Sequence, residues 1–284
     1  MVVIKMKYDL HIHTTCSDGK YSKLELLKYF NDNDFKYVAF ADHNYIELKS
    51  DEEINNEYLL RYNEKQLVKM ISAIEFDVLE NKYLHILGYD IKNKERINKL
   101  MEYVKKTNTE ITKQIIDNIK RVYRIEVNIN DLINNSVDGD ISKRDITKWM
   151  IKNGYAKDYI EAGLLYTSKE SPCYEKKYSP TIDEVINIIY ECGGYSIMAH
   201  PFSLKLDETE TKKYIYKLVE KGLIGIEVNN LDKTTPNQIK VLKKIATDLS
   251  LLQTSGSDFH NEKTTQKIGL DNSDSDEFIR VLRR

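Results

Sequence analysis

Short segments that combine histidine with aspartate or glutamate carry the chemistry that this 284-residue sequence predicts. Residues 11–13 (HIH) place two imidazoles two positions apart, which on a β-strand puts both on one face. Residues 42–43 (DH) and 258–260 (DFH) each add a carboxylate and an imidazole. Nitrogen and oxygen donors without thiolates suit divalent ions such as Mn, Fe or Zn. The segments therefore predict a metal centre.

Four further residues could belong to the same centre, although each alone has a simpler interpretation. Asp18, in the turn-like SDG, could be an ordinary turn residue. Glu75 lies in the apolar run SAIEF, where burial would require a cation or hydrogen bonds unless the residue faces solvent on an edge strand. His85 and His200 could be core histidines with satisfied nitrogens. Because all six histidines lie in such segments, we favour a shared metal site.

The elements that must position these residues follow from the alternation of apolar runs with helical patterns. Polar residues at the carboxyl ends of parallel strands mark the active-site end of β/α folds. The sequence therefore predicts a parallel sheet or barrel with the metal centre at that end. Helices are predicted at residues 22–35, 51–69, 181–194, 209–221 and 237–249. Strands are predicted at residues 7–13, 37–43, 70–79, 83–90, 195–201, 223–228 and 251–260, with a hairpin between 70–79 and 83–90.

The middle of the chain departs from this alternation. Residues 93–178 show helical patterns without a comparable apolar strand run. We therefore expect a first barrel part at 1–92, an inserted helical subdomain at 93–178 that caps the substrate, and a second barrel part at 179–284.

Composition limits the classes of partner. The chain has 43 Lys and Arg against 45 Asp and Glu, a formal charge of −2, so no global positive field attracts nucleic acid or a membrane. Phosphate recognition must then be local. Three scattered cysteines suit a reducing compartment rather than a disulfide framework. The first 13 residues lack the apolar region of a signal peptide. We expect a soluble cytoplasmic protein without an obligate protein partner.

Six segments occur together in one order, namely HIHTTCSDG, ADHN, IEF, LHILGYD, MAHP and GSDFH. In this combination the chain resembles the PHP (polymerase and histidinol phosphatase) superfamily over about residues 1–90 and 180–270. The HILGYD segment, the helical insertion and ECGG before AHP resemble its stand-alone phosphoesterase branch. That branch includes nucleoside 3′,5′-bisphosphate phosphatases and 5′-to-3′ exoribonucleases of the RNase AM type. The resemblance implies a distorted (β/α)7 TIM-like barrel with a trinuclear metal site at the carboxyl ends of its strands.

By motif position, the resemblance also implies nine ligands to three divalent ions, with Glu75 as a bridge between two of them. The first ion would be held by His11, His13, Glu75 and Asp258, the second by Glu75, His85 and His200, and the third by Asp18, His43 and His260. The residues implied in catalysis are Glu75, Asp18, His43, His200, Asp258 and His260.

Two segments depart from the family pattern. The usual TDHDT reads ADHNY at residues 41–45, which keeps the histidine but changes its neighbours. The Arg-Pro-His segment of the insertion corresponds to SKRDI at residues 142–146. Counting back from Gly154 aligns Lys143 with the arginine and Asp145 with the histidine, whereas residue type selects Arg144. Lys143 and Arg144 are therefore both candidate phosphate contacts.

The implied activity is metal-dependent hydrolysis of phosphate esters of nucleotides or short oligonucleotides by a metal-bound hydroxide, with phosphate or an alcohol as product. Asp42 could orient a ligand, relay a proton or cap the following helix. A histidinol phosphatase shares much of the metal set. An amidohydrolase would not require Asp18, His43 or His260. A noncatalytic metal-stabilised module would not be expected to retain all nine ligands.

Overall fold

The computed structural model describes residues 7–135, 141–231, 233–261, 268–270 and 274–283. Residues 1–6, part of the segment expected to lack a signal peptide, lie outside the described residues. The chain divides into two units, one formed by residues 1–98 with 180–284 and the other by residues 99–179. Among the described helices, none is long and apolar enough to cross a membrane.

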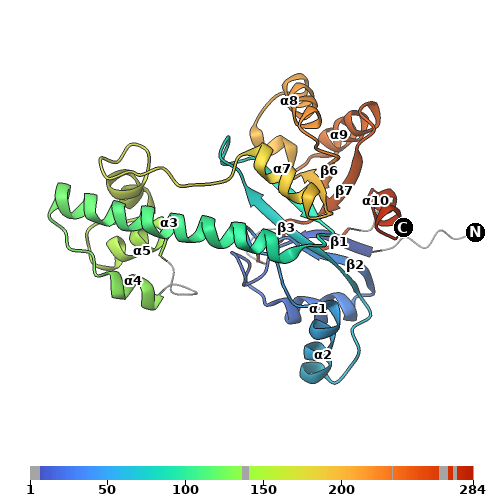
Figure 1. Cartoon of the computed structure of the whole chain (residues 1–284), viewed down its shortest axis with the longest axis horizontal. Helices are drawn as coiled ribbons and strands as arrows, with labels where there is room; N and C mark the ends of the chain where they lie inside the picture. Colours follow the sequence, from blue (N-terminus) through green and yellow to red (C-terminus); the bar gives the residue numbers. More distant parts are fainter. Residues whose placement is uncertain (1–6, 136–140, 232, 262–267, 271–273, 284) are drawn as a thin grey trace, which may run out of the picture. The chain divides into compact units, whose positions relative to one another are not determined.

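A seven-stranded sheet, in which neighbouring strands follow chain order, forms the centre of the first unit (Figure 1). The backbone N–H of Asp258 donates to the carbonyl of His11 at 2.7 Å, and Ile12 forms a parallel bridge with Phe259. These contacts join the first strand to the segment after the last one, so the sheet is a nearly closed barrel. The strands are β1 (Lys7–Ile12), β2 (Phe35–Phe40), β3 (Lys69–Asp77), β4 (His85–Tyr89), β5 (Tyr195–Met198), β6 (Gly225–Asn230) and β7 (Leu252–Gly256).

One strand, β4, runs against the others. It pairs antiparallel with both β3 and β5, so the hairpin expected from the sequence is present. All other neighbouring strands pair in parallel. Because β4 is reversed, its first residue, His85, lies at the end of the barrel where the parallel strands finish. The reversal therefore brings a histidine that begins a strand to the same place as those that end one.

Reciprocal capping boxes fix the start of most helices around the barrel. In α1, for example, the Ser22 hydroxyl accepts from the Glu25 N–H while the Glu25 carboxylate accepts from the Ser22 N–H. Helix α2 ends at Tyr62, before the predicted end at residue 69, because Asn63 adopts a left-handed conformation with φ 53°. The helices are α1 (Lys23–Asp32), α2 (Asp51–Tyr62), α7 (Ile182–Glu191), α8 (Glu208–Glu220), α9 (Pro236–Asp248) and α10 (Asp276–Leu282), with a short 3₁₀ helix at Pro201–Leu204.

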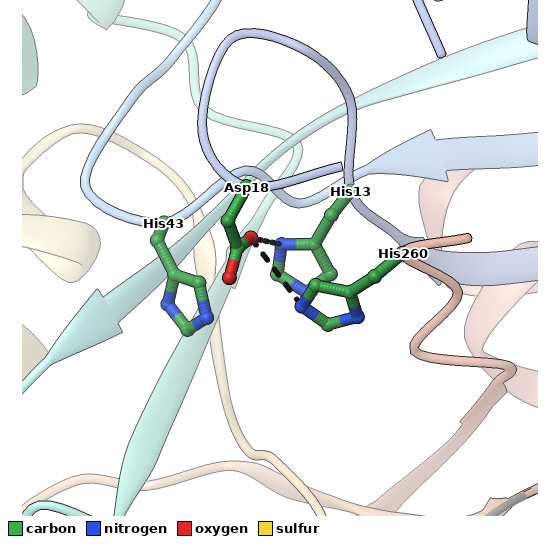
Figure 2. Close-up of side chains that lie close together, drawn as sticks. All are labelled: His13, Asp18, His43 and His260. Carbon is green, nitrogen blue, oxygen red and sulfur yellow. Dashed lines mark ion pairs between the residues drawn. The ribbon is translucent and has the colours of Figure 1, made fainter. Parts of the chain in front are cut away.

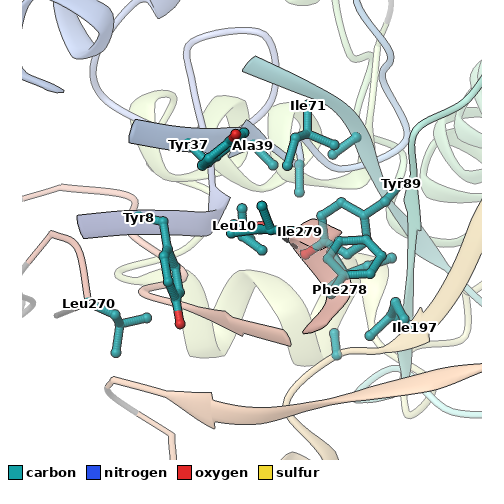
Figure 3. Packing of buried hydrophobic residues seen from close by; sticks show 14 residues of the cluster. Tyr8, Leu10, Tyr37, Ala39, Ile71, Tyr89, Ile197, Leu270, Phe278 and Ile279 are labelled. Atoms are coloured by element: carbon teal, nitrogen blue, oxygen red, sulfur yellow. Dashed lines mark hydrogen bonds between the residues drawn. The ribbon is translucent and has the colours of Figure 1, made fainter. Parts of the chain in front are cut away.

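An apolar cluster fills the barrel (Figure 3). Its aromatic members include Tyr89, whose hydroxyl donates to the carbonyl of Leu10 at 2.6 Å, and Phe278 of α10, whose ring centroid lies 5.2 Å from that of Tyr89. Burial of one such large side chain contributes about 1.5–3 kcal/mol. Ile12 lies instead in a second cluster with Leu27 of α1. A register shift between Asp9 and Ile12 accompanies this change of side.

The second unit is helical and has its own hydrophobic core. Ile115 and Ile119, one helical turn apart on α3, pack in one cluster with Ile146, Trp149 and Met150 of α5. Helix α3 begins in the first unit and continues into the second. The helices are α3 (Lys94–Tyr123), α4 (Ile129–Asn135), α5 (Lys143–Lys152) and α6 (Tyr159–Ala162), followed by a π-helix at Gly163–Thr167.

Candidate metal centre

The nine residues that the sequence nominates lie together at one end of the barrel. His11, near the end of β1, and Glu75, on β3, are carried by strands, whereas His43 and His200 lie in the loops just after β2 and β5. Side-chain donor atoms within 4.8 Å of one another form four groups among the described residues. These are His11, His13, Glu75 and Asp258; Glu75, His85 and His200; His13, Asp18, His43 and His260; and His43, Asp77 and His85.

The first group is fully buried. His13 Nε2 lies 3.0 Å from Asp258 Oδ1 and 3.3 Å from Glu75 Oε2, and His11 Nε2 lies 3.3 Å from the same Glu75 oxygen. All four side chains are at most 1% exposed. Two imidazoles and two carboxylates converging on one point form a donor set suited to a divalent ion.

Glu75 also forms part of the second group, through its other oxygen. Its Oε1 lies 2.9 Å from His85 Nδ1 and 3.1 Å from His200 Nε2, whereas its Oε2 faces the first group. The alternative in which Glu75 faces solvent is wrong, because the side chain is only 1% exposed. One carboxylate therefore presents its two oxygens to two different sets of histidines.

The third group, drawn in Figure 2, contains the partly exposed residues Asp18, His43 and His260 and is called the open side of the centre. Asp18 Oδ1 is 3.3 Å from His260 Nε2 and 3.6 Å from His13 Nδ1. The ring of His43 lies 4.7 Å from that of His13. Asp18 is 40% exposed, in contrast to the buried first group. His13 directs Nε2 to the first group and Nδ1 to the third, so it lies between them.

Unsatisfied buried atoms show that this donor set fits a cation. His11 Nε2, His13 Nδ1 and Glu75 Oε2 are buried and make no hydrogen bond among the described residues. Buried polar atoms without partners cost free energy, so native proteins rarely leave several in one place. A divalent ion would satisfy these nitrogen and oxygen lone pairs together.

The charges of the centre compensate one another. Burial alone would raise the pKa of Glu75, but neighbouring imidazoles, led by His11, hold this pKa well below its ordinary value. Burial alone would likewise raise the pKa of Asp258, but the charge of His11, the hydrogen bond with His13 and the charge of Lys233 together hold this pKa well below its usual range. Burial lowers the pKa of His11, but the charges of Glu75 and Glu227 raise it well above normal. Both carboxylates are therefore held ionised at neutral pH.

Glu227 on β6 orients two of the histidines and was not predicted. Its Oε1 lies 3.1 Å from His11 Nδ1, and its Oε2 accepts from the backbone N–H of His200 at 2.9 Å. In the neutral ring, which a bound metal ion would require, a proton on His11 Nδ1 donates to Glu227 and leaves Nε2 with a lone pair directed at the centre. The signal was present in the sequence, because Glu227 interrupts the apolar run LIGIEV much as Glu75 interrupts SAIEF.

Asp77 was also missed. Its Oδ1 lies 3.3 Å from His43 Nδ1 and 3.6 Å from His85 Nε2. Asp77 lies two residues after Glu75 on β3, so both side chains point to the same face of the strand. Asn44, at one of the positions that depart from the family pattern, accepts from the Asp77 N–H at 3.1 Å and has a positive φ of 51°. This departure therefore positions a carboxylate beside the centre.

Asp42 fixes the loop that carries Asp18. Its carboxylate accepts hydrogen bonds of 2.7 Å from the backbone and hydroxyl of Thr14 and from the hydroxyl of Ser17. The following helix, α2, is capped by Ser50 instead, so the capping alternative for Asp42 is wrong. Asp42 thus acts on the third group through the loop.

The two candidate phosphate contacts of the insertion lie in the second unit. Lys143 is half-buried, donates to the carbonyl of Glu175, and has its Nζ 4.1 Å from the ring centroid of Tyr174. Arg144 is exposed. Asp145 forms a capping box with Ser142 at the start of α5. A contact of Lys143 or Arg144 with substrate stays a prediction.

No protein-family model matches the sequence. The chain is 24% identical over 256 residues to a 5′-3′ exoribonuclease of Haemophilus influenzae, covering 89% of this chain and 90% of that protein. It is 24% identical over 258 residues to the 5′-3′ exoribonuclease Rnm of Escherichia coli, covering 89% and 85% of the two chains.

Two solved structures share the fold. A protein of Bifidobacterium adolescentis described as a metal-dependent phosphoesterase has a TM-score of 0.70 at 21% identity and covers 97% of this chain and 95% of its own. An amidohydrolase of Chromobacterium violaceum with bound sulfate has a TM-score of 0.68 at 19% identity, covering 93% and 91%. These likenesses confirm the predicted barrel fold. The names of the exoribonuclease relatives agree with the predicted class of enzyme, a phosphoric ester hydrolase.

Proposed function

We propose that this chain, a relative of the stand-alone PHP phosphoesterases, hydrolyses phosphate esters of nucleotides or short oligonucleotides and removes nucleotides from the 5′ end of RNA. The proposal rests on the carboxylate of Glu75. Its two oxygens lie 2.9–3.3 Å from ring nitrogens of two different sets of histidines. The two relatives named as 5′-3′ exoribonucleases support the RNA substrate.

Three divalent ions, each of Mn, Fe or Zn, would be held by the nine residues and would supply a nucleophilic water near neutral pH together with charge neutralisation at phosphorus. Glu75 would join the first and second positions. His13, which faces both the first and third groups, would set the spacing between them. Support for three ions comes from three of the four groups, which between them contain all nine residues.

The chain's own residues fix how the donors face the substrate. His260 Nδ1 lies 2.7 Å from the carbonyl of Asp258, so a proton on Nδ1 donates to that oxygen and leaves Nε2 directed at Asp18. His11 is held in the same tautomer by Glu227. Donors fixed in this way lose little freedom when the substrate arrives, which is the condition for preorganised electrostatic stabilisation.

Two other activities share part of this geometry. An amidohydrolase is supported by one similar structure, but that likeness concerns the fold. The third group, Asp18 with His43 and His260, favours phosphate chemistry. It could hold a further divalent ion on the open side, where positive charge would attract a phosphate group. A histidinol-phosphatase-type phosphomonoesterase would use the same groups, so the substrate must separate it from a nuclease.

A direct assay tests the proposal. Protein loaded with Mn or Zn should release mononucleotides from the 5′ end of a 5′-phosphorylated RNA oligonucleotide and should act more slowly on histidinol phosphate. The variant Glu75→Gln, which keeps the side-chain volume, serves as the inactive control. Metal-loaded protein that leaves RNA, 3′,5′-bisphosphonucleotides and nucleotide monophosphates all intact would contradict the proposal.

A further inference from the structure

Lys233, in the loop between β6 and α9, lies at the edge of the metal centre. Its ammonium forms an ion pair with Oδ2 of Asp258, whose other oxygen, Oδ1, lies 3.0 Å from His13 Nε2. The Lys233 side chain is 37% exposed, whereas that of Asp258 is 1% exposed. One carboxylate oxygen of Asp258 therefore faces the buried donors, and the other pairs with an ammonium group that solvent can reach.

The turn that carries Lys233 is tied to the centre by hydrogen bonds. Asn230 is fully buried, and its side-chain amide donates to Glu227 Oε2 at 3.0 Å. Its backbone N–H donates to the Thr234 hydroxyl at 2.8 Å, and that hydroxyl donates back to the Asn230 carbonyl at 2.6 Å. The Lys233 N–H donates to the same carbonyl at 3.2 Å. The carboxylate that orients His11 thus also anchors this turn.

With divalent ions bound at the centre, the ammonium of Lys233 would cost free energy unless an anion besides Asp258 bound to it. Divalent ions at the centre would be repelled by the ammonium and would share Asp258 with it. A phosphate group approaching from solvent would instead be attracted, because its oxygens accept charge-assisted hydrogen bonds. Lysine is a common phosphate binder that acts as a compact charge on a flexible stem.

We propose that Lys233 forms an anion site, in which its ammonium donates to a terminal phosphoryl oxygen while Asp258 keeps Oδ1 toward the centre. This inference rests on the proposed function and narrows its ligand to a phosphate group with at least one free, charged oxygen. The site selects such a group over a neutral amide, and it also accepts inorganic phosphate, the product of monoester hydrolysis.

The experiment measures the affinity of the full-length, metal-loaded protein for inorganic phosphate by isothermal titration calorimetry. Lys233→Met, which keeps the stem but removes the charge, should weaken phosphate binding roughly tenfold or more, as expected for loss of a hydrogen bond to a charged group. Lys233→Arg should stay within a few-fold of the wild type. The control is Lys244→Met on α9, because Lys244 is 76% exposed and should leave phosphate affinity unchanged.

Metal content, measured by mass spectrometry in all four proteins, separates this role from a structural one. We expect it to be equal, because the nine proposed ligands are retained. Wild-type phosphate affinity in Lys233→Met, or no phosphate binding by the wild type, would overturn the inference, as would loss of metal from Lys233→Met. Binding needs no turnover. A wild type that hydrolyses no phosphate ester but binds phosphate through Lys233 would refute the proposed function and leave the anion site standing.

Discussion

The buried and open sides of the candidate metal centre have the same types of donor atom but differ in their exposure to solvent. His11, Glu75 and Asp258 are at most 1% exposed, whereas Asp18 and His43 are 40% and 25% exposed. Buried donors are held by one another and by Glu227, while Asp18 depends on a loop. We expect the buried side to fix the framework and the open side to exchange ligands with substrate and solvent. The predictions below test this division.

The largest effect is expected at Glu75, because it belongs to both buried groups. Glu75→Ala should remove bound metal and lower the rate of phosphoester hydrolysis by roughly a thousandfold, the upper range for loss of a preorganised charge-stabilising group. Metal analysis by mass spectrometry and a hydrolysis assay provide the two readouts. Glu75→Gln, which keeps the side-chain volume, controls for the cavity that Glu75→Ala leaves. Retention of both metal and turnover in Glu75→Ala would show that the centre is wrongly placed.

A matched pair of substitutions compares the two sides directly. Asp258→Asn should lose metal from the buried group, whereas Asp18→Asn should lose only the metal of the open group. The open group contains partly exposed residues, so Asp18→Asn should also keep the wild-type melting temperature in the metal-free state. Metal stoichiometry and thermal unfolding distinguish the variants. Equal metal loss in the two variants would contradict the proposed difference between the buried and open sides.

A substitution of Glu227 tests how far metal binding on the buried side depends on the orientation of His11. Glu227→Gln keeps the volume but changes the partner of His11 Nδ1, so we expect metal affinity or activity to fall roughly 10- to 100-fold. Competition with a coloured chelator measures the affinity. Glu220→Gln, at the exposed end of α8, is the control. Unchanged metal affinity and turnover in Glu227→Gln would show that His11 needs no such support.

The smallest effect is expected at Asp42, which acts only through the loop of Asp18. Asp42→Asn weakens the acceptor for Thr14 and Ser17 and should reduce activity by about tenfold or less. Metal bound to the buried groups should be unaffected. A loss of all bound metal would instead mean that Asp42 supports the whole centre.

The residue pattern predicts alternating strands and helices and the segments that meet at one end of the sheet, because histidines placed at strand ends mark that end. The choice of a barrel over an open parallel sheet came from the family resemblance. His85 was harder to place from periodicity, since it begins a strand, and the reversal of β4 brings it to Glu75. Asp77 and Lys233 were missed because a carboxylate near a turn and a lysine in a loop are usually solvated surface charges. Their roles depend on contacts between distant segments, which a local pattern does not encode.

The most direct test of the central claim is anomalous X-ray scattering from crystals of the metal-loaded protein. We predict three peaks at the barrel end, two of them bridged by the oxygens of Glu75 and the third beside Asp18, His43 and His260. A single peak, or peaks that Glu75 does not contact, would contradict the claim.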